Sequence, residues 1–312
     1  MQKVTVNSLK LLGLIAVLIV VAVGCGGGGT SGEVDLSDAN ISVGSKEFTE
    51  QLILGQMSIL VLENAGATVK DRTSLAGSVA TRKALTSGQI DMYWDYTGTG
   101  WIVYLGHTKP VEGSQEQYEA VAKEDLKKNG IEWLPPAPAS NTYAIAVRSE
   151  AADKLGVTKL SDLKPLFQEQ PDQATLCAAS EFLSRDDGLP GLEKAYGFEF
   201  ENISELAEGP IYQATDQGDR CTFGEVFATD GRLAQLDLKV LEDDKSFFPI
   251  YNPSLLVDKK VMDQYPQIEK IFAPINKKLT TEELQKLNEK VDVQGQLEDQ
   301  VAEEWLKENG FI

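Results

Sequence analysis

Apolar positions after residue 40 alternate between short runs typical of strands and longer segments with a helical period. Residues 41–44 predict a strand, and residues 45–50 begin a helix with acidic residues in its first turn. Gly66 ends that helix, a second strand is expected near 67–69, and a short helix follows that Gly88 ends. Strands alternating with helices in this way are typical of an α/β fold.

The segment 90–96 predicts a strand that ends in an aromatic residue. Its period-2 alternation places Ile90, Met92, Trp94 and Tyr96 on one face. Tyr96 stands at the carboxyl end of the strand, which is where ligands bind in open α/β sheets. The hydroxyl groups and backbone N–H groups of residues 97–100 follow directly.

The order of the remaining elements predicts two lobes. The proline-rich residues 135–138 form an extended connector, residues 143–147 read as a strand, and a second set of elements runs to about residue 248. After residues 249–253 another strand and several helices reach the carboxyl end. We therefore expect residues 40–143 and 252–312 to form lobe 1 and residues 144–251 to form lobe 2, with two hinge crossovers and a ligand cleft between the lobes.

Charge and residue counts exclude several functions. The 312 residues include 48 acids and 29 bases, which give a formal charge of −19, so a nucleic-acid partner is not expected. One histidine, His107, rules out multi-histidine metal sites, and three cysteines cannot form a four-cysteine zinc site. We expect no metal and no cofactor.

The amino terminus predicts export. Lys3 and Lys10 flank an apolar run at 11–23 that is too short to span a bilayer comfortably, which is typical of a signal peptide over residues 1–25. Residues 22–25 resemble a bacterial lipobox, so Cys25 is the predicted site of lipidation, and residues 26–39 form a flexible tether. The alternative is a chance cysteine beside an ordinary cleavage site.

Export also changes the interpretation of the other two cysteines. Cys177 and Cys221 enter an oxidising compartment, where two remaining thiols most simply form a disulfide. Closing a loop of that length contributes about 4 kcal/mol in the chain-entropy model. The alternative is a pair of unlinked, buried thiols.

Four motifs in order carry a resemblance to a known family. They are residues 44–51 (GSKEFTEQ), 96–99 (YTGT), 185–191 (RDDGLPG) and 227–232 (FATDGR). Together they resemble the substrate-binding proteins of osmoprotectant ABC importers, which take up glycine betaine, carnitine or choline. The resemblance covers the chain from about residue 41 to 312. It implies a type II periplasmic-binding-protein fold that captures a quaternary ammonium solute and does no chemistry on it.

The resemblance also implies roles for individual residues. Tyr96, Tyr143 and Tyr251 match positions whose rings surround the cationic head of the ligand, and Phe227 stands where the family commonly has a fourth ring, a tyrosine. A phenyl ring keeps the π face but lacks the hydroxyl. The positions that hold a ligand carboxylate in the family are matched by Lys46, Thr99 and Arg185.

These residue types suit such a ligand. A trimethylammonium group has no N–H to donate, and each aromatic face contributes about 0.5–2 kcal/mol as a cation–π partner. A lysine, a threonine hydroxyl and an arginine fork suit a carboxylate, which favours a carboxylated betaine over choline.

Each assignment has a simpler structural alternative. A tyrosine at a strand end is more often a core or rim residue than part of a ligand site. Lys46 near a helix start is compatible with a solvated side chain. Arg185 stands beside Asp186 and Asp187, which is compatible with a salt-bridged turn.

The sequence therefore predicts a monomeric, lipid-anchored receptor at the outer face of the cytoplasmic membrane. Its partners would be a quaternary ammonium ligand, the membrane through Cys25, and an ABC permease served by a cytoplasmic ATPase. A receptor for another zwitterion, such as an amino acid, is the first alternative. A secreted enzyme acting on a small cation is the second, although the chain offers no nucleophile and base that pair.

Overall fold

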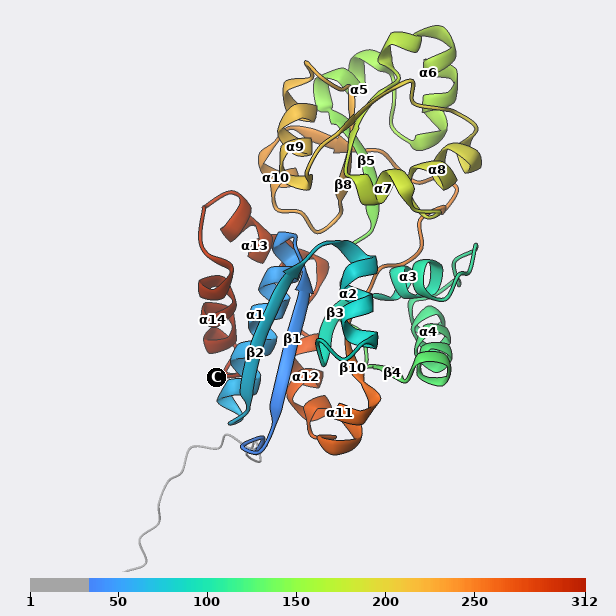
Figure 1. Ribbon diagram of the computed structural model, residues 1–312. Coiled ribbons are helices and arrows are strands. Elements are labelled where there is room, and N and C mark those ends of the chain that lie inside the picture. Colours follow the sequence, from blue (N-terminus) through green and yellow to red (C-terminus); the bar gives the residue numbers. More distant parts are fainter. Residues whose placement is uncertain (1–33) are drawn as a thin grey trace, which may run out of the picture. The chain divides into compact units, whose positions relative to one another are not determined.

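The computed structural model describes residues 34–312 and contains two five-stranded mixed sheets (Figure 1). The first sheet has the order β2-β1-β3-β10-β4. Its strands are β1 (Asn40–Lys46), β2 (Thr68–Leu75), β3 (Met92–Tyr96), β4 (Ile131–Trp133) and β10 (Pro253–Asp258). β1 runs parallel to β2 and β3, whereas β10 runs antiparallel to β3 and β4.

Helices cover both faces of this sheet (Figure 1). The helix α1 packs on β1 and β2 and is itself covered by α13 and α14. The helical elements are α1 (Thr49–Asn64), α2 (Gly77–Thr86), α3 (Thr97–Thr99), a π-turn (Gly100–Tyr104), α4 (Ser114–Asn129), α11 (Lys259–Gln264), α12 (Ile268–Asn276), α13 (Thr281–Asp292) and α14 (Glu298–Glu308).

The second sheet repeats the same arrangement with the order β7-β6-β8-β5-β9. Its strands are β5 (Tyr143–Arg148), β6 (Thr175–Ala178), β7 (Asn202–Glu205), β8 (Phe223–Phe227) and β9 (Leu238–Val240). Around it lie α5 (Ser149–Leu155), α6 (Leu163–Glu169), α7 (Ser180–Ser184), α8 (Leu189–Tyr196), α9 (Glu208–Gln217), α10 (Arg232–Gln235) and 3₁₀ turns at Leu160–Asp162 and Pro171–Gln173. The two-lobed type II fold is confirmed.

The two connections between the sheets lead into their antiparallel strands. After the first connection the chain enters β5, which runs antiparallel to β8 and β9. After the second it enters β10, which runs antiparallel to β3 and β4. Consequently the starts of β5 and β10 lie beside the ends of β8 and β3, and all four strand ends meet where the chain crosses between lobes.

Several predicted boundaries shift. The first helix begins at Thr49 rather than Ser45, because the ladder of β1 extends as far as the pairing of Lys46 with Leu75. The predicted short strand at 67–69 is the eight-residue β2. Tyr143, which was placed last in lobe 1, is the first residue of the second sheet.

The amino-terminal predictions fall mostly outside the described residues. The signal peptide over 1–25, the lipidated Cys25 and residues 26–33 of the tether all lie there. The predicted end of the tether at residue 39 is too late, since Leu36 is buried and its N–H donates to the Ala65 carbonyl at 2.7 Å. Among residues 34–312 no helix is long and apolar enough to cross a membrane.

The predicted disulfide is present. Cys177 at the end of β6 is bonded to Cys221, 44 residues later, just before β8. Both residues are buried against Ile211 of α9. The bond therefore links β6 to the residues just before its neighbour β8, inside lobe 2, and packs against α9.

Candidate functional site

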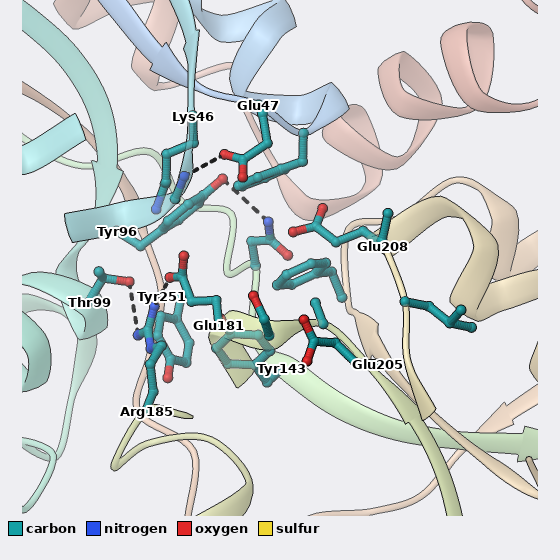
Figure 2. Close-up of a pocket in the computed structure, with 18 residues that line it drawn as sticks. Lys46, Glu47, Tyr96, Thr99, Tyr143, Glu181, Arg185, Glu205, Glu208 and Tyr251 are labelled. Carbon is teal, nitrogen blue, oxygen red and sulfur yellow. Dashed lines mark hydrogen bonds and ion pairs between the residues drawn. The ribbon is translucent and has the colours of Figure 1, made fainter. Parts of the chain in front are cut away.

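Side chains from both sheets line one cavity of about 400 Å³ (Figure 2). All seven residues that the sequence assigned to the ligand lie on its wall. The remaining lining residues include a further ring, an amide and several acids. The full set is Lys46, Glu47, Phe48, Gly77, Tyr96, Thr99, Asn141, Tyr143, Ala179, Ser180, Glu181, Arg185, Glu205, Leu206, Ala207, Glu208, Phe227 and Tyr251.

Strand register brings the predicted rings together. Tyr96 is the last residue of β3 and pairs with Pro253, the first residue of β10. Tyr251 comes two residues before Pro253 and therefore lies near the end of β3. In the second sheet Tyr143, the first residue of β5, pairs with Phe227, the last residue of β8. Three strand ends and the residue two positions before β10 thus supply the four rings.

The rings form a contiguous wall, which we call the aromatic end of the cavity: Phe48, Tyr96, Tyr143, Phe227 and Tyr251. The ring centroid of Tyr143 lies 5.0 Å from that of Phe227 and 5.6 Å from that of Tyr251, to which it is nearly perpendicular. Phe48 stacks between Tyr96 and Phe227, at 6.3 and 5.6 Å. Gly98 leaves room for Tyr251, because a Cβ atom there would stand 2.8 Å from its ring.

Buried carboxylates fix two of the tyrosine rings from behind. The Tyr96 hydroxyl donates to Glu50 Oε1 at 2.7 Å, and the Tyr251 hydroxyl donates to Asp187 Oδ2 at 2.7 Å. Burial raises the pKa of Glu50 above its usual value and raises the pKa values of both tyrosines well above theirs. The phenols therefore stay protonated and serve as donors to these carboxylates.

Lys46, Thr99, Glu181 and Arg185 form the polar end of the cavity. Lys46 is buried, and its ammonium group pairs with Asp95 Oδ1 at 2.9 Å and donates to Ser78 Oγ at 3.2 Å. The same nitrogen lies 4.8 Å from the centroid of the Tyr96 ring. Lys46 is therefore not a solvated side chain, and its charge already has a protein partner.

The guanidinium of Arg185 is likewise engaged. It forms a bidentate pair with Asp187 at 2.7 and 2.6 Å, and Nη1 donates to Glu181 Oε1 at 2.6 Å. Nη2 also donates to Thr99 Oγ1 across the lobes at 3.3 Å. Arg185 therefore does form the salt-bridged turn that the sequence offered as an alternative, and this turn lies on the cavity wall.

Glu181 completes the polar end from α7. Its Oε1 accepts from Ser78 Oγ at 2.5 Å and its Oε2 accepts from the Ser78 N–H at 3.0 Å. Burial alone would raise the pKa of Glu181, but the charges of Lys46 and Arg185 and the Ser78 hydrogen bonds outweigh it and hold the pKa at about 2. Glu181 is therefore ionised at neutral pH.

Three further acids, Glu47, Glu205 and Glu208, line the cavity (Figure 2). Glu205 ends β7 and Glu208 begins α9, while the carboxylate of Glu47 accepts from the Gly77 N–H at 2.7 Å. Burial raises the pKa of Glu208 well above its usual value, and the neighbouring Glu225, Glu47 and Glu181 raise it further. The cavity as a whole carries more acids than bases and favours a cation.

Sequence reasoning missed Phe48, Asn141 and Glu181. Phe48 lies inside the first quoted motif, two residues after Lys46, so that motif held the signal. Asn141 precedes β5 at the crossover and donates to Glu50 at 3.0 Å. Glu181 lies four residues before Arg185, which is the spacing of an ion pair on a helix, but the short helix α7 was not anticipated.

Comparison with known proteins shows the family of the chain. Residues 39–308 match the model of the substrate binding domain of ABC-type glycine betaine transport systems. The chain belongs to this family. It is 36% identical to the glycine betaine-binding protein YehZ of Escherichia coli over 87% of this chain and 91% of that protein, and 37% identical to a glycine-betaine-binding protein of Pseudomonas aeruginosa over 87% and 88%.

A solved structure described as a glycine betaine/carnitine/choline ABC transporter superimposes with a TM-score of 0.70 at 28% identity. It covers 87% of this chain and 98% of that one. Members of the family are solute-binding components of importers, which act outside the cytoplasm, and they are not enzymes. The chain is accordingly a binding protein of an ABC importer.

Proposed function

We propose that this protein captures a quaternary ammonium osmolyte of the glycine betaine type and delivers it to a membrane permease powered by a cytoplasmic ATPase. The supporting observation is the aromatic end of the cavity, where five rings from both lobes lie around one space. Cation–π contacts of about 0.5–2 kcal/mol per ring suit a methylated cation that has no N–H to donate. In this proposal Lys46, Thr99 and Arg185 face the distal end of the ligand.

The relatives support the same ligand class. Two of them are named glycine betaine-binding proteins, and another, at 28% identity, is named a carnitine transport binding protein. An amino acid would need an acceptor for its N–H donors beside the rings. The carboxylates behind the aromatic end, Glu50 and Asp187, accept from tyrosine hydroxyls, so an amino group would have to reach Glu47, Glu205 or Glu208 elsewhere on the wall. The aromatic faces thus favour the methylated cation.

Calorimetric titration of the purified chain tests the ligand class. Glycine betaine, carnitine and choline are titrated separately, with proline as the zwitterion that lacks N-methyl groups. We expect saturable heat from at least one methylated compound and a weaker response to proline. Silence from all three methylated compounds would refute the proposed ligand class.

Delivery and anchoring are tested in cells. In a strain that lacks its own copy, the chain should restore uptake of the labelled ligand, whereas a Tyr96→Ala variant should not. We also propose that Cys25 carries the lipid, so that a Cys25→Ser variant should be recovered from the soluble extracytoplasmic fraction. A Cys25→Ser variant that stays with the membrane would contradict the lipid anchor alone.

A further inference from the structure

The Glu181 carboxylate occupies a position that suits a carboxylate from a ligand. It comes from α7 in lobe 2 and reaches the first turn of α2, a ten-residue helix in lobe 1. There it accepts from the Ser78 hydroxyl at 2.5 Å and the Ser78 N–H at 3.0 Å, and it also accepts from Arg185 at 2.6 Å. A helix N-terminus, a hydroxyl and a guanidinium together form a typical set of donors for a bound anion.

We propose that Glu181 is a built-in competitor for the carboxylate of the ligand and thereby sets how strongly the cavity discriminates between carboxylated and uncharged distal groups. This inference rests on the proposed function, because it concerns the distal end of the same quaternary ammonium ligand. Lys46, Thr99 and Arg185 become available to a ligand carboxylate only to the extent that Glu181 gives up its place beside them.

The charges at the polar end support the competition. Lys46 and Arg185 are the two cations lining the cavity, and they are paired with three carboxylates, those of Asp95, Asp187 and Glu181. Arg185 and the two aspartates are buried, with at most 8% of each residue exposed. A fourth carboxylate, brought by a betaine, would add a second uncompensated negative charge where water screens poorly. A hydroxyl, as in choline, adds none.

Of the three carboxylates, Glu181 is the one that can move aside. The side chains of Asp95 and Asp187 are almost fully covered, whereas about a third of the Glu181 side chain, 32%, is exposed. Asp95 also accepts from the Tyr93 hydroxyl at 2.7 Å, and Asp187 accepts from that of Tyr251. Glu181 also bridges the lobes through Ser78, so withdrawal of its carboxylate would remove a contact between them.

A matched ligand pair tests the inference. Glycine betaine and choline share the trimethylammonium group and differ at the distal carbon, which is a carboxylate in one and a hydroxymethyl group in the other. Their dissociation constants are measured by calorimetry for the wild-type chain and for Glu181→Gln, which keeps the size of the side chain but removes the charge. We expect the ratio of the glycine betaine constant to the choline constant to fall at least tenfold, mainly through tighter binding of glycine betaine.

Two further variants separate this effect from general electrostatics and from misfolding. Glu205→Gln removes an exposed charge from the wall of the same cavity and should change the ratio less than twofold, since water and salt screen that charge. Ser78→Ala deletes one donor to Glu181 and should lower the ratio about threefold. If thermal melting shows that Glu181→Gln does not fold, Ser78→Ala decides the question.

The possible outcomes distinguish this inference from the proposed function. If the wild-type chain binds neither ligand, both are wrong. If it binds at least one, and the ratio stays within twofold of wild type in a folded Glu181→Gln, the competition is wrong and the proposed function stands. A fall of equal size in Glu205→Gln would also overturn it, because the effect would then be one of net charge.

Discussion

The aromatic end and the polar end of the cavity differ in what their side chains already contact. At the aromatic end the tyrosine hydroxyls point backward to Glu50 and Asp187, and the ring faces have no polar requirement to satisfy. At the polar end each charged group has a protein partner, Asp95 for Lys46 and both Asp187 and Glu181 for Arg185. In the proposed function a ligand can contact the ring faces directly, whereas at the polar end it must replace an existing protein contact.

This difference suggests that the two ends govern different properties, the aromatic end the affinity and the polar end the selectivity. Contacts with ring faces are the same for every trimethylammonium compound, so the aromatic end should set the affinity for all of them. Contacts at the polar end are exchanged rather than added, so their net contribution depends on the charge of the distal group. Changes at the aromatic end should therefore affect glycine betaine and choline equally, and changes at the polar end should affect them differently.

The largest effect is expected for Tyr96→Ala. The change removes a cation–π face and the apolar burial of one ring, together about 4 kcal/mol, which corresponds to about a thousandfold loss of affinity. The loss should be similar for glycine betaine and choline, as measured by calorimetry. Tyr96→Phe keeps the face and removes only the hydroxyl that donates to Glu50, so its loss should be much smaller.

A thermal melt of each variant is the control, since Tyr96→Ala also leaves the buried Glu50 without one of its donors. The proposed division between the two ends would be wrong if a folded Tyr96→Ala variant still bound choline and lost binding of glycine betaine alone. Tyr96 would then act on the distal group rather than on the cationic head.

A second prediction concerns Glu225, a buried residue of β8. Its Oε2 accepts from the N–H of Ala179, a cavity-lining residue, at 2.7 Å. Burial raises the pKa of Glu225 to about 8, and the nearby Glu181 contributes to the rise. At neutral pH the two carboxyl groups therefore differ in charge: Glu225 is mainly protonated and neutral, whereas Glu181 is ionised.

The sign of the pH dependence follows from this raised pKa. Between pH 4.5 and pH 8 the folded state holds a proton on Glu225 that the unfolded chain has released, so stability falls as the pH rises. From pH 6 to pH 8 the free energy of unfolding of the wild type should fall by about 2 kcal/mol more than that of Glu225→Gln, which cannot titrate. Urea unfolding at both pH values measures the difference, and parallel pH profiles would refute it.

The sequence pattern was sufficient to predict the α/β fold class and to place Tyr96 at the end of a strand, because both depend on local patterns. The family resemblance singled out Tyr143 and Phe227, which begin and end strands of the second sheet. Their meeting depends on register, Tyr143 with Phe227 and Tyr96 with Pro253. The family resemblance supplied that part, since strand register is not readable from one chain.

The contacts that the side chains of the polar end make within the protein could not be predicted. Lys46, Thr99 and Arg185 were correctly expected on one cavity, but the contact between Glu181 and Ser78 joins residues 103 positions apart in two lobes. Such a pairing leaves no periodic signal in the sequence. Phe48 was missed for a different reason: the segment that contains it was assigned to a helix, whereas it lies just before α1 and stacks on two other rings.

A moderate effect is expected for Thr99→Val, which tests the polar end without changing any charge. The substitution keeps the shape of a buried side chain and removes the hydroxyl that accepts from Arg185 at 3.3 Å. In the proposed function this hydroxyl also donates to the ligand carboxylate, and losing one such hydrogen bond corresponds to about 1 kcal/mol, so glycine betaine should bind about fivefold more weakly. Choline should change by less than about twofold. Thr99→Ser keeps the hydroxyl and is the control, and equal losses for both ligands in Thr99→Val would contradict the division between the two ends.

The smallest effect is expected for Phe227→Tyr, which adds a hydroxyl to the ring without removing its face. The ring of Phe227 already packs 5.0 Å from Tyr143 and 5.6 Å from Phe48, and a tyrosine would present the same face. Affinity for both ligands should therefore stay within about threefold of wild type. Phe227→Leu keeps apolar contact but loses the π face, so it should weaken both ligands more than Phe227→Tyr does. If Phe227→Tyr instead strengthened glycine betaine alone, the added hydroxyl would be acting on the carboxylate, and the aromatic end would take part in selectivity.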